Sequence, residues 1–538
     1  MASTENVVRC VGSQAKFNTA RHSLGILRAV VVTCRYRVSA TYLRHQSLSL
    51  HDAIENALAA VVLRQAMLRV GIAGEDTKEP AFVRLKTIDM RRMIEWKELI
   101  IPAVPTPSAE VKADKGKNEE EQAEARYEDG LIRSHEKYHE ALWEDLANKP
   151  GWKIVVHHNP QQLGALLSLD ISFCFHHAYS DGKGGYIFHG DFQRALNNAA
   201  RPRELQNHIL SLPTAPNLPP GMDALIPFSL SWAFILRMVW AEILYPVLVP
   251  PFLRRLLYLE PSEADLPWAG APVDGSNPKV HIRTLFQIDE AQLKRILAQC
   301  RSHKASLTGL LHALIARSLA RLVGDRSFRS TTPIALEGYA DPGIIAGSAF
   351  TPGETIHCLV TGLSCAHGLD AIRPLQRGRD DGNTRVGDDD AAVWAFARDM
   401  TARLRDKAAS LPRDDILALS GLVGDWHEFL RNKFGKARDS SWELSNLGSL
   451  GAIDAKGISG PKTEGGRRPE DEGHWFIDRA VFTQGANAIG SAISFNVAGV
   501  AGHGIYVTAS WQDGIVDVDL VERLAGEMRA CVAELGEA

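Results

Sequence analysis

Residues 169–185 read LDISFCFHHAYSDGKGG, and this stretch indicates the fold and the chemistry of the chain better than any other. Its first seven residues alternate well enough to form a β-strand. The strand runs into the pair His176 and His177, and then into Asp181 and a turn rich in glycine. A strand that ends in a glycine-rich turn is a place where proteins display reactive side chains. We therefore expect a strand, a loop that carries chemistry and a helix over 184–198.

His177 is the candidate general base of this loop. An imidazole with an unperturbed pKa of about 6.5 accepts protons readily at physiological pH. Such a base helps an alcohol to attack a thioester, because it removes the hydroxyl proton as the new bond forms and then returns it to the leaving thiolate. We expect Asp181 to hold the loop, for example through an ion pair with an arginine elsewhere in the chain.

Two other interpretations of the histidine pair stay open from the spacing alone. The pair could be structural, as we expect for His157 and His158, which precede a turn at Asn159-Pro160 and lack a following Asp-Gly. A metal site is disfavoured, because adjacent side chains on an extended strand point to opposite faces and one ion rarely binds both.

Outside the loop, the pattern predicts two α/β lobes of similar size joined by an apolar connector. Strands are expected over 27–37, 152–157, 280–288, 491–497 and 504–511, and helices over 49–67, 306–322 and 520–535. Ser49 and Ser306 are the expected N-caps of two of these helices. We place the N-terminal lobe at 1–215, the connector at 216–274 and the C-terminal lobe at 275–538.

Four segments stand out by composition. Residues 109–130 are dense in Glu, Lys and Ala, which predicts a surface helix or a flexible insertion. Residues 368–390 and 455–473 are rich in charge and glycine and predict mobile surface loops. Residues 226–257 are strongly apolar but interrupted by charges and prolines. We expect there a helix buried between domains, with a helix on a membrane surface as the alternative and a spanning helix disfavoured.

The composition excludes several classes of protein. The 538 residues are 45% hydrophobic and carry a net charge of −4, which leaves no global positive field to attract nucleic acid. The seven cysteines are scattered and form no CxxC pair, so neither a disulfide framework nor a zinc site is expected. The sequence contains no GxSxG elbow and no Walker A motif. The first residues lack the order of a secretory signal, so we expect a cytoplasmic protein, peripheral on an intracellular membrane if 226–257 binds lipid.

The loop sequence HHAYSDG at 176–182 resembles the HHxxxDG motif of the acyltransferase superfamily that includes chloramphenicol acetyltransferase, plant BAHD acyltransferases and condensation domains of peptide synthetases. Residues 8–25, 188–192 (FHGDF) and 442–448 (WELSNLG) resemble the fungal alcohol acetyltransferase branch. The resemblance spans most of the chain except the three charged insertions. The DFGWG motif of the plant branch is absent, and 445–448 (SNLG) lies roughly where an equivalent element is expected.

The resemblance implies an α/β fold of two chloramphenicol acetyltransferase-like lobes, each a mixed sheet with flanking helices, with an active-site tunnel between them. It implies that His177 is the base and that Asp181 is chiefly structural, its side chain turned away from the substrate. Gly182 is then the tight-turn glycine, and His176 a supporting residue. The implied co-substrate is an acyl-CoA, above all acetyl-CoA, with no permanently bound cofactor and no metal.

Three further residues are candidates for binding the co-substrate. Lys183 directly follows the motif and is a candidate for a phosphate of coenzyme A, so basic residues of this kind are expected at one tunnel mouth. Ser445 and Asn446 are candidate donors to a tetrahedral oxyanion, with a capped turn as an equal alternative.

The predicted function is therefore an O-acyltransferase that moves an acyl group from a CoA thioester to an alcohol. We expect an acetyl group, a lipophilic secondary metabolite as acceptor, and a monomer. Two alternatives stay open. One is a condensation-domain-like enzyme with a carrier-protein thioester or an amine acceptor. The other is a non-catalytic binding relative, against which the intact His177, Asp181 and Gly182 argue.

Overall fold

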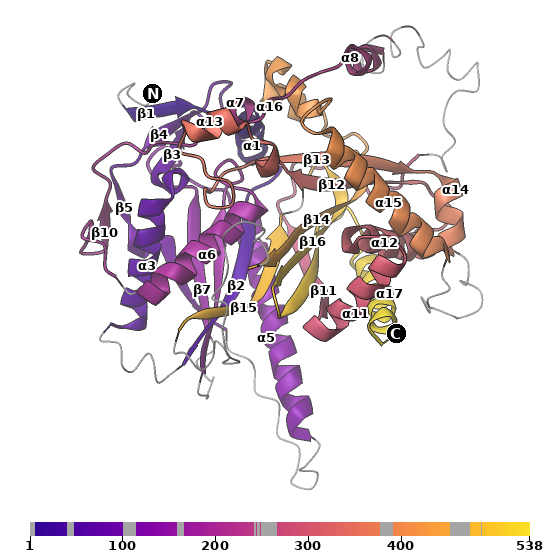
Figure 1. Cartoon of the computed structure of the whole chain (residues 1–538), viewed down its shortest axis with the longest axis horizontal. Coiled ribbons are helices and arrows are strands. Elements are labelled where there is room, and N and C mark those ends of the chain that lie inside the picture. The colour runs from indigo at the N-terminus through magenta and orange to yellow at the C-terminus, as the bar shows by residue number, and fades with distance from the viewer. Residues whose placement is uncertain are drawn as a thin grey trace.

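Two mixed β-sheets form the centres of two lobes in the computed structural model (Figure 1). The described residues are 6–39, 48–99, 115–158, 166–198, 200–240, 244, 248, 266–376, 391–451, 474–485 and 487–537. The first sheet has the strand order β15 (Phe476–Gln484), β2 (Val30–Ser39), β8 (Leu166–Phe175), β7 (Trp152–His158) and β6 (Ile94–Glu98). The second has the order β11 (Val280–Ile288), β17 (Gly504–Gln512), β16 (Ser491–Val500), β14 (Ser440–Leu450), β12 (Phe328–Ala335) and β13 (Val360–His367). The predicted two-lobed α/β fold is confirmed.

Both sheets mix parallel and antiparallel pairs. In the first sheet β6 and β7 are parallel and the other pairs antiparallel. In the second, β14 runs parallel to both β12 and β16. Two small sheets, β1 (Val7–Cys10), β4 (Ala81–Arg84) and β3 (Val70–Ala73), and β5 (Thr87–Asp89), β10 (Ile209–Ser211) and β9 (Leu205–Gln206), flank the first lobe.

Helices cover the sheets. The first lobe carries α1 (Ser13–Ser23), α3 (Leu50–Arg64), η2 (Ala66–Arg69), α4 (Met90–Met93) and α6 (Gly182–Asn198). The short helix α7 (Met222–Leu225) belongs to the connector. The second carries α11 (Glu290–Ser302), α12 (Leu307–Val323), η4 (Glu337–Tyr339), α13 (Pro342–Ala346), α14 (Leu369–Ile372), η5 (Arg373–Gln376), α15 (Ala391–Ser410), η6 (Ile416–Leu422), α16 (Trp426–Arg431) and α17 (Val518–Glu537). Both predicted serine caps are confirmed, because the hydroxyls of Ser49 and Ser306 accept hydrogen bonds from the first turns of α3 and α12.

One strand of the first sheet comes from the C-terminal part of the chain. β15 pairs antiparallel with β2, so that Phe476 lies opposite Arg37 and Gln484 opposite Val30. The predicted lobe boundaries stay a prediction, but a cut through the connector would separate β15 from its sheet. The two lobes are therefore joined by strand pairing as well as by the connector.

Helix α5 (Lys115–Glu140) extends beyond the charged segment predicted at 109–130 and lies between the two sheets at its C-terminal end (Figure 1). Tyr127, Leu131 and Ile132 on this helix are buried. Ion pairs join its acidic residues to both lobes, from Glu128 to Arg479 and from Glu136 to Arg283. A flexible insertion is therefore the wrong interpretation for the described part of this segment. Residues 109–114 lie outside the described residues.

The two predicted loops fall largely outside the described residues. Residues 377–390 and the whole of 455–473 belong to the undescribed part of the chain. Residues 369–376, at the start of the first predicted loop, instead form α14 and η5.

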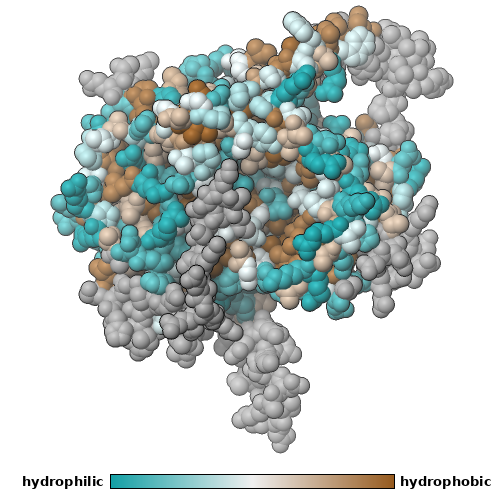
Figure 2. All heavy atoms as spheres, in the orientation of Figure 1, coloured by the Kyte–Doolittle hydropathy of each residue, from teal (hydrophilic) through white to brown (hydrophobic). Residues whose placement is uncertain are grey.

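The connector carries an exposed helix, α8 (Trp232–Val239), at the upper right of Figure 1. None of its residues is buried, and Trp232 and Leu236 are 79% and 65% exposed. A helix buried between domains is therefore the wrong prediction for α8, whose apolar side chains appear as brown spheres in Figure 2. No single described helix is long and apolar enough to cross a membrane, although α11 and α12, bent by 92°, together pass that test.

Candidate active site

The motif loop lies at the junction of the two lobes. β8 ends at Phe175, as the sequence predicts, and α6 begins at Gly182, two residues before the start predicted at 184. His177 lines a cavity of about 750 Å³ whose walls come from both lobes. The first lobe contributes Arg21 and Lys183, and the second contributes Glu443 and Ser445. The cavity occupies the place predicted for the tunnel.

His177 is held in a single tautomer. Its Nδ1 lies 2.9 Å from the backbone oxygen of Ser180. Since a carbonyl only accepts, Nδ1 carries the proton and Nε2 keeps a lone pair. Burial, with a smaller contribution from the charge of Arg21, lowers the pKa of His177 to about 4, so the ring is neutral at physiological pH. A neutral imidazole with a free Nε2 is the form that a general base requires.

His176 supports the loop from the other side. Its Nδ1 accepts the N–H of Ala178 at 2.9 Å, so Nε2 donates to Glu75 at 2.7 Å. His22 donates from Nδ1 to the same Glu75 oxygen at 2.8 Å, while its Nε2 accepts the N–H of Trp143. Burial raises the pKa of Glu75, but these two hydrogen bonds overcome that effect and bring it to about 2.

The triad of His22, Glu75 and His176 also has the composition of a metal site, since its ligand atoms lie within 4.8 Å of one another. However, backbone N–H groups occupy the outer nitrogen of each imidazole, so the nitrogens that face Glu75 are protonated. Protonated nitrogens do not bind a cation. The arrangement is therefore a hydrogen-bonded support for the motif loop.

Asp181 is held by backbone groups rather than by an arginine. Its two carboxylate oxygens accept N–H groups from Gly184 and Leu359, each at 2.9 Å. Among the described residues no ion pair to Asp181 forms, so the expected arginine partner is wrong. Burial raises the pKa of this carboxyl. Asp181 lines the cavity, yet both of its oxygens are engaged in joining α6 to the segment before β13, an arrangement that suits a structural role.

The glycines of the loop are needed for space. A Cβ at Gly182 would lie 2.3 Å from Leu447 Cδ2, and one at Gly185 would lie 2.5 Å from Val32 Cγ2. Neither glycine has a backbone φ in the left-handed region. Close packing against both lobes, rather than an unusual backbone angle, is therefore the reason for these two glycines.

The three residues predicted to bind the co-substrate, Lys183, Ser445 and Asn446, all line the cavity. The side-chain amide of Asn446 is already engaged, because it donates to Thr308 Oγ1 at 3.1 Å and accepts the N–H of Gly448 at 2.9 Å. This geometry favours the capped turn for Asn446. The roles of Lys183 and Ser445 stay predictions.

Sequence reasoning missed the contribution of helix α1. Asn18 Nδ2 donates to the backbone oxygen of His177 at 3.2 Å and lies 3.6 Å from Cys358 Sγ. Cys358 in turn lies 3.6 Å from His177 Nδ1. The only signal for these contacts was the resemblance at residues 8–25, which carries no information on which side chains meet the loop.

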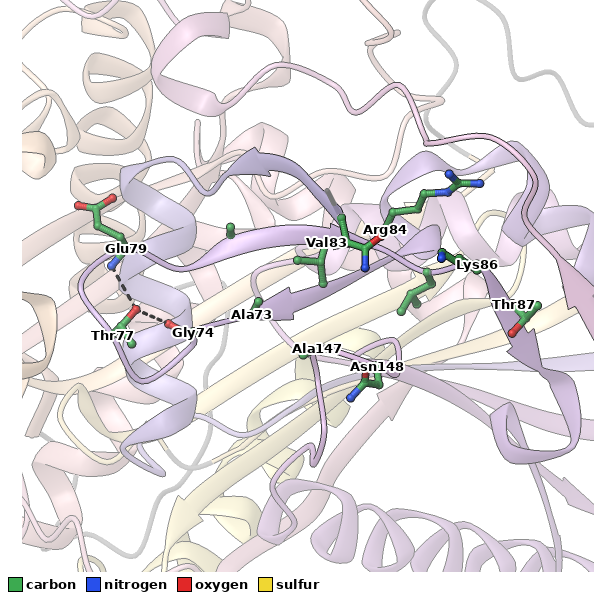
Figure 3. Close-up of a pocket in the computed structure, with 13 residues that line it drawn as sticks. Ala73, Gly74, Thr77, Glu79, Val83, Arg84, Lys86, Thr87, Ala147 and Asn148 are labelled. Carbon is green, nitrogen blue, oxygen red and sulfur yellow. Dashed lines mark hydrogen bonds between the residues drawn. The ribbon is translucent and has the colours of Figure 1, made fainter. Parts of the chain in front are cut away.

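A second hollow lies in the first lobe, over strands β3 and β4 (Figure 3). Its lining includes Gly74, Thr77, Arg84, Lys86 and Asn148. None of the candidate catalytic or co-substrate-binding residues lines it. We therefore place the chemistry in the cavity of His177.

Comparison with known proteins agrees with this geometry. A family model for alcohol acetyltransferases matches residues 113–332, which include the motif loop. A probable alcohol acetyltransferase of Fusarium pseudograminearum is 26% identical over 99% of this chain and 96% of its own length. A probable alcohol acetyltransferase of Aspergillus fumigatus is 23% identical over 95% of this chain and 96% of its own. The chain is an acyltransferase, and it is similar to alcohol acetyltransferases.

Solved structures share the fold of this acyltransferase. A trichothecene 15-O-acetyltransferase of Fusarium sporotrichioides superposes with a TM-score of 0.62 at 14% identity, over 98% of this chain and 94% of that one. The polyketide synthase associated protein 5 of Mycobacterium tuberculosis gives a TM-score of 0.52 at 13% identity, over 99% and 98%. At these identities the likeness concerns the fold of the acyltransferase alone.

Proposed function

We propose that this acyltransferase moves an acetyl group from acetyl-CoA to the hydroxyl of a lipophilic secondary metabolite, with His177 as general base. The observation that carries the proposal is the state of His177, a half-buried neutral imidazole with Nδ1 fixed by Ser180 in a cavity shared by both lobes. An imidazole in this state accepts a proton at Nε2 without first having to lose one.

The reaction follows from that geometry. Nε2 of His177 removes the proton of the acceptor hydroxyl as the oxygen bonds to the thioester carbonyl carbon, and the carbonyl electron pair moves to its oxygen. When that pair returns, the carbon–sulfur bond breaks. The thiolate of CoA then takes the proton from the imidazolium, which restores neutral His177. The products are the acetate ester and CoA.

The cavity lining supports a lipophilic acceptor. Its walls include the apolar side chains of Phe17, Trp426, Leu447 and Phe482. Apolar walls with a few polar groups are typical of sites for small organic ligands. The trichothecene 15-O-acetyltransferase with the same fold acts, by its name, on a trichothecene, which supports an acceptor of secondary-metabolite type here.

Mass spectrometry of acetyl transfer tests the proposal. Purified protein is incubated with acetyl-CoA and a pooled panel of lipophilic alcohols, water-soluble alcohols and amines. We expect a new acetate ester from the lipophilic alcohols, made by the parent protein only. A product from amines alone, or one formed only with a carrier-protein thioester as donor, would contradict the proposed reaction.

We also propose that α8 binds the surface of an intracellular membrane and brings the acceptor cavity to it. Trp232, Leu236 and Trp240 repeat every four residues and so share one helical face, where they are 79%, 65% and 51% exposed. Met238 of the same helix lines the cavity of His177. Tryptophan and leucine on an exposed helical face suit the boundary between headgroups and acyl chains.

Vesicle flotation measures this membrane contact. We expect the parent protein to float with phosphatidylcholine vesicles, and the triple variant Trp232→Ser/Leu236→Ser/Trp240→Ser to remain in the dense fraction, because the apolar face that enters the bilayer is lost. Leu142→Ser is a matched control, since Leu142 is also exposed but lies on the first lobe. Equal flotation of the parent and the triple variant would exclude α8 as the contact.

A further inference from the structure

Helix α1 places a buried cation in the cavity of His177. Arg21 lines the cavity and only 9% of the residue is exposed. Its Nη1 donates to Asn18 Oδ1 at 3.2 Å, and Asn18 Nδ2 donates to the backbone oxygen of His177 at 3.2 Å. One side-chain amide thus connects the guanidinium to the backbone of the candidate base. The position of Arg21 relative to His177 is therefore set by the fold.

Much of the hydrogen-bonding capacity of Arg21 is unused. Its Nε is buried and has no hydrogen-bond partner among the described residues. No carboxylate in the described part of the chain forms an ion pair with it, and the guanidinium instead lies 5.0 Å from the ring centre of Phe17. A buried cation without a directly paired anion costs stability. Its presence in the wall of a ligand cavity indicates that a negatively charged group binds there.

Glu443, on β14, also lines the cavity, and its negative charge raises the pKa of Arg21. Burial lowers the pKa of Arg21 to about 10, against the opposing effect of Glu443, so the guanidinium remains protonated at neutral pH. The carboxylate of Glu443 accepts a hydrogen bond from Gln484 at 3.2 Å. The hydrogen bond to the Glu443 carboxylate thus comes from a neutral amide. The other N–H groups of the Arg21 guanidinium stay available to a ligand.

We propose that Arg21 is a further catalytic residue, the cationic donor that stabilises the tetrahedral oxyanion; the inference rests on the acyl transfer proposed above. As the acceptor oxygen bonds to the carbonyl carbon, the carbonyl electron pair moves to its oxygen, and an N–H of Arg21 donates to that oxyanion. When the pair returns to the carbon, the bond to sulfur breaks and the thiolate takes the proton held by His177. A charged, largely buried donor that is held in place before the reaction stabilises such charge more strongly than a neutral donor does.

The positive charge of Arg21 also lowers the pKa of His177, which gives the experiment a second measurable quantity. Two groups act on the charge of the imidazole, Arg21 on α1 and His176 on the motif loop, and Cys358 before β13 lies 3.6 Å from its Nδ1. The same cavity wall also carries Asp181, Lys183 and Glu443. Of these, Arg21 is the cation that opposes protonation of His177 most strongly. Removing its charge therefore raises the pKa of His177, and the acid limb of the rate profile moves to higher pH.

The experiment compares Arg21→Met, Arg21→Lys and the parent. Cleavage of acetyl-CoA is followed by thiol release, and ester formation by mass spectrometry of the same samples. We expect Arg21→Met to lower kcat about 100-fold or more with little change in KM for acetyl-CoA, and Arg21→Lys to recover part of the loss because it keeps the charge. Arg317→Met, a buried arginine of α12 outside the cavity wall, is the control for loss of a buried cation.

The outcomes separate the two proposals. A kcat for Arg21→Met within about threefold of the parent, with an unmoved acid limb, overturns the role of Arg21 even if ester forms. A parent protein that cleaves acetyl-CoA without making an ester contradicts the proposed acceptor but still reports on Arg21 through thiol release. A parent that does neither contradicts both. Thermal melting of each variant shows whether a rate loss reflects unfolding, and Arg21→Lys carries the test if Arg21→Met does not fold.

Discussion

Replacing His177 by alanine is expected to lower the rate of acyl transfer by about 1000-fold or more while the protein stays folded. General base catalysis contributes about 100- to 10,000-fold, and no neighbouring group replaces the lost Nε2. His176 is already committed to Glu75, and burial raises the pKa of Cys358 well above its ordinary value, so neither group can accept the proton. The fold should tolerate the change, because the lost hydrogen bond to Ser180 is worth only about 1 kcal/mol.

The measurement is kcat for ester formation, with thermal melting of the same preparations. His158→Ala is the matched control, since His158 belongs to the other histidine pair and lies at the end of β7, away from the cavity wall. Activity of His177→Ala within about tenfold of the parent would remove the assignment of the base. A variant that no longer melts cooperatively would instead assign His177 a structural role.

Asp181→Ala is expected to cost both stability and activity. The substitution leaves the N–H groups of Gly184 and Leu359 buried without an acceptor, at about 1–3 kcal/mol for each orphaned group. Because these groups belong to α6 and to the segment before β13, the loss loosens the junction of the lobes where His177 lies. We therefore expect a lower melting temperature together with a fall in kcat.

Chemical denaturation and initial rates of Asp181→Ala and Asp181→Asn test this account. Asparagine keeps one acceptor oxygen, so it should recover part of the lost stability. A free energy of unfolding for Asp181→Ala equal to that of the parent would show that the two backbone contacts do not hold the loop. A stable but inactive variant would point to a direct role of the carboxylate in the reaction.

The local part of the structure could be predicted from the sequence. The strand, loop and helix around His177 follow from alternation, glycines and a histidine pair that lie within twenty residues of one another. The N-caps Ser49 and Ser306 were predictable for the same reason, since a cap depends on its own first turn. The two-lobed architecture came from the resemblance carried by the motif.

Contacts between distant segments could not be predicted. The carboxylate of Asp181 is bound in part by Leu359, and the support of His176 runs through Glu75 to His22. The local sequence pattern around Asp181 or His176 does not indicate which distant residue will contact it. The apolar composition of α8 predicted burial, yet composition does not say whether an apolar face meets protein or another medium.

The pairing of β15 with β2 has a consequence for the synthesis of the chain. Until residues 476–484 have left the ribosome, the N-terminal lobe lacks its outer strand and β2 is an open edge with unpaired backbone groups. Folding of the first lobe thus waits for nearly the whole polypeptide, and a chain terminated in the connector exposes a surface that invites intermolecular strand pairing. Production of the enzyme is therefore sensitive to truncation in a way that a simple two-lobe arrangement would not be.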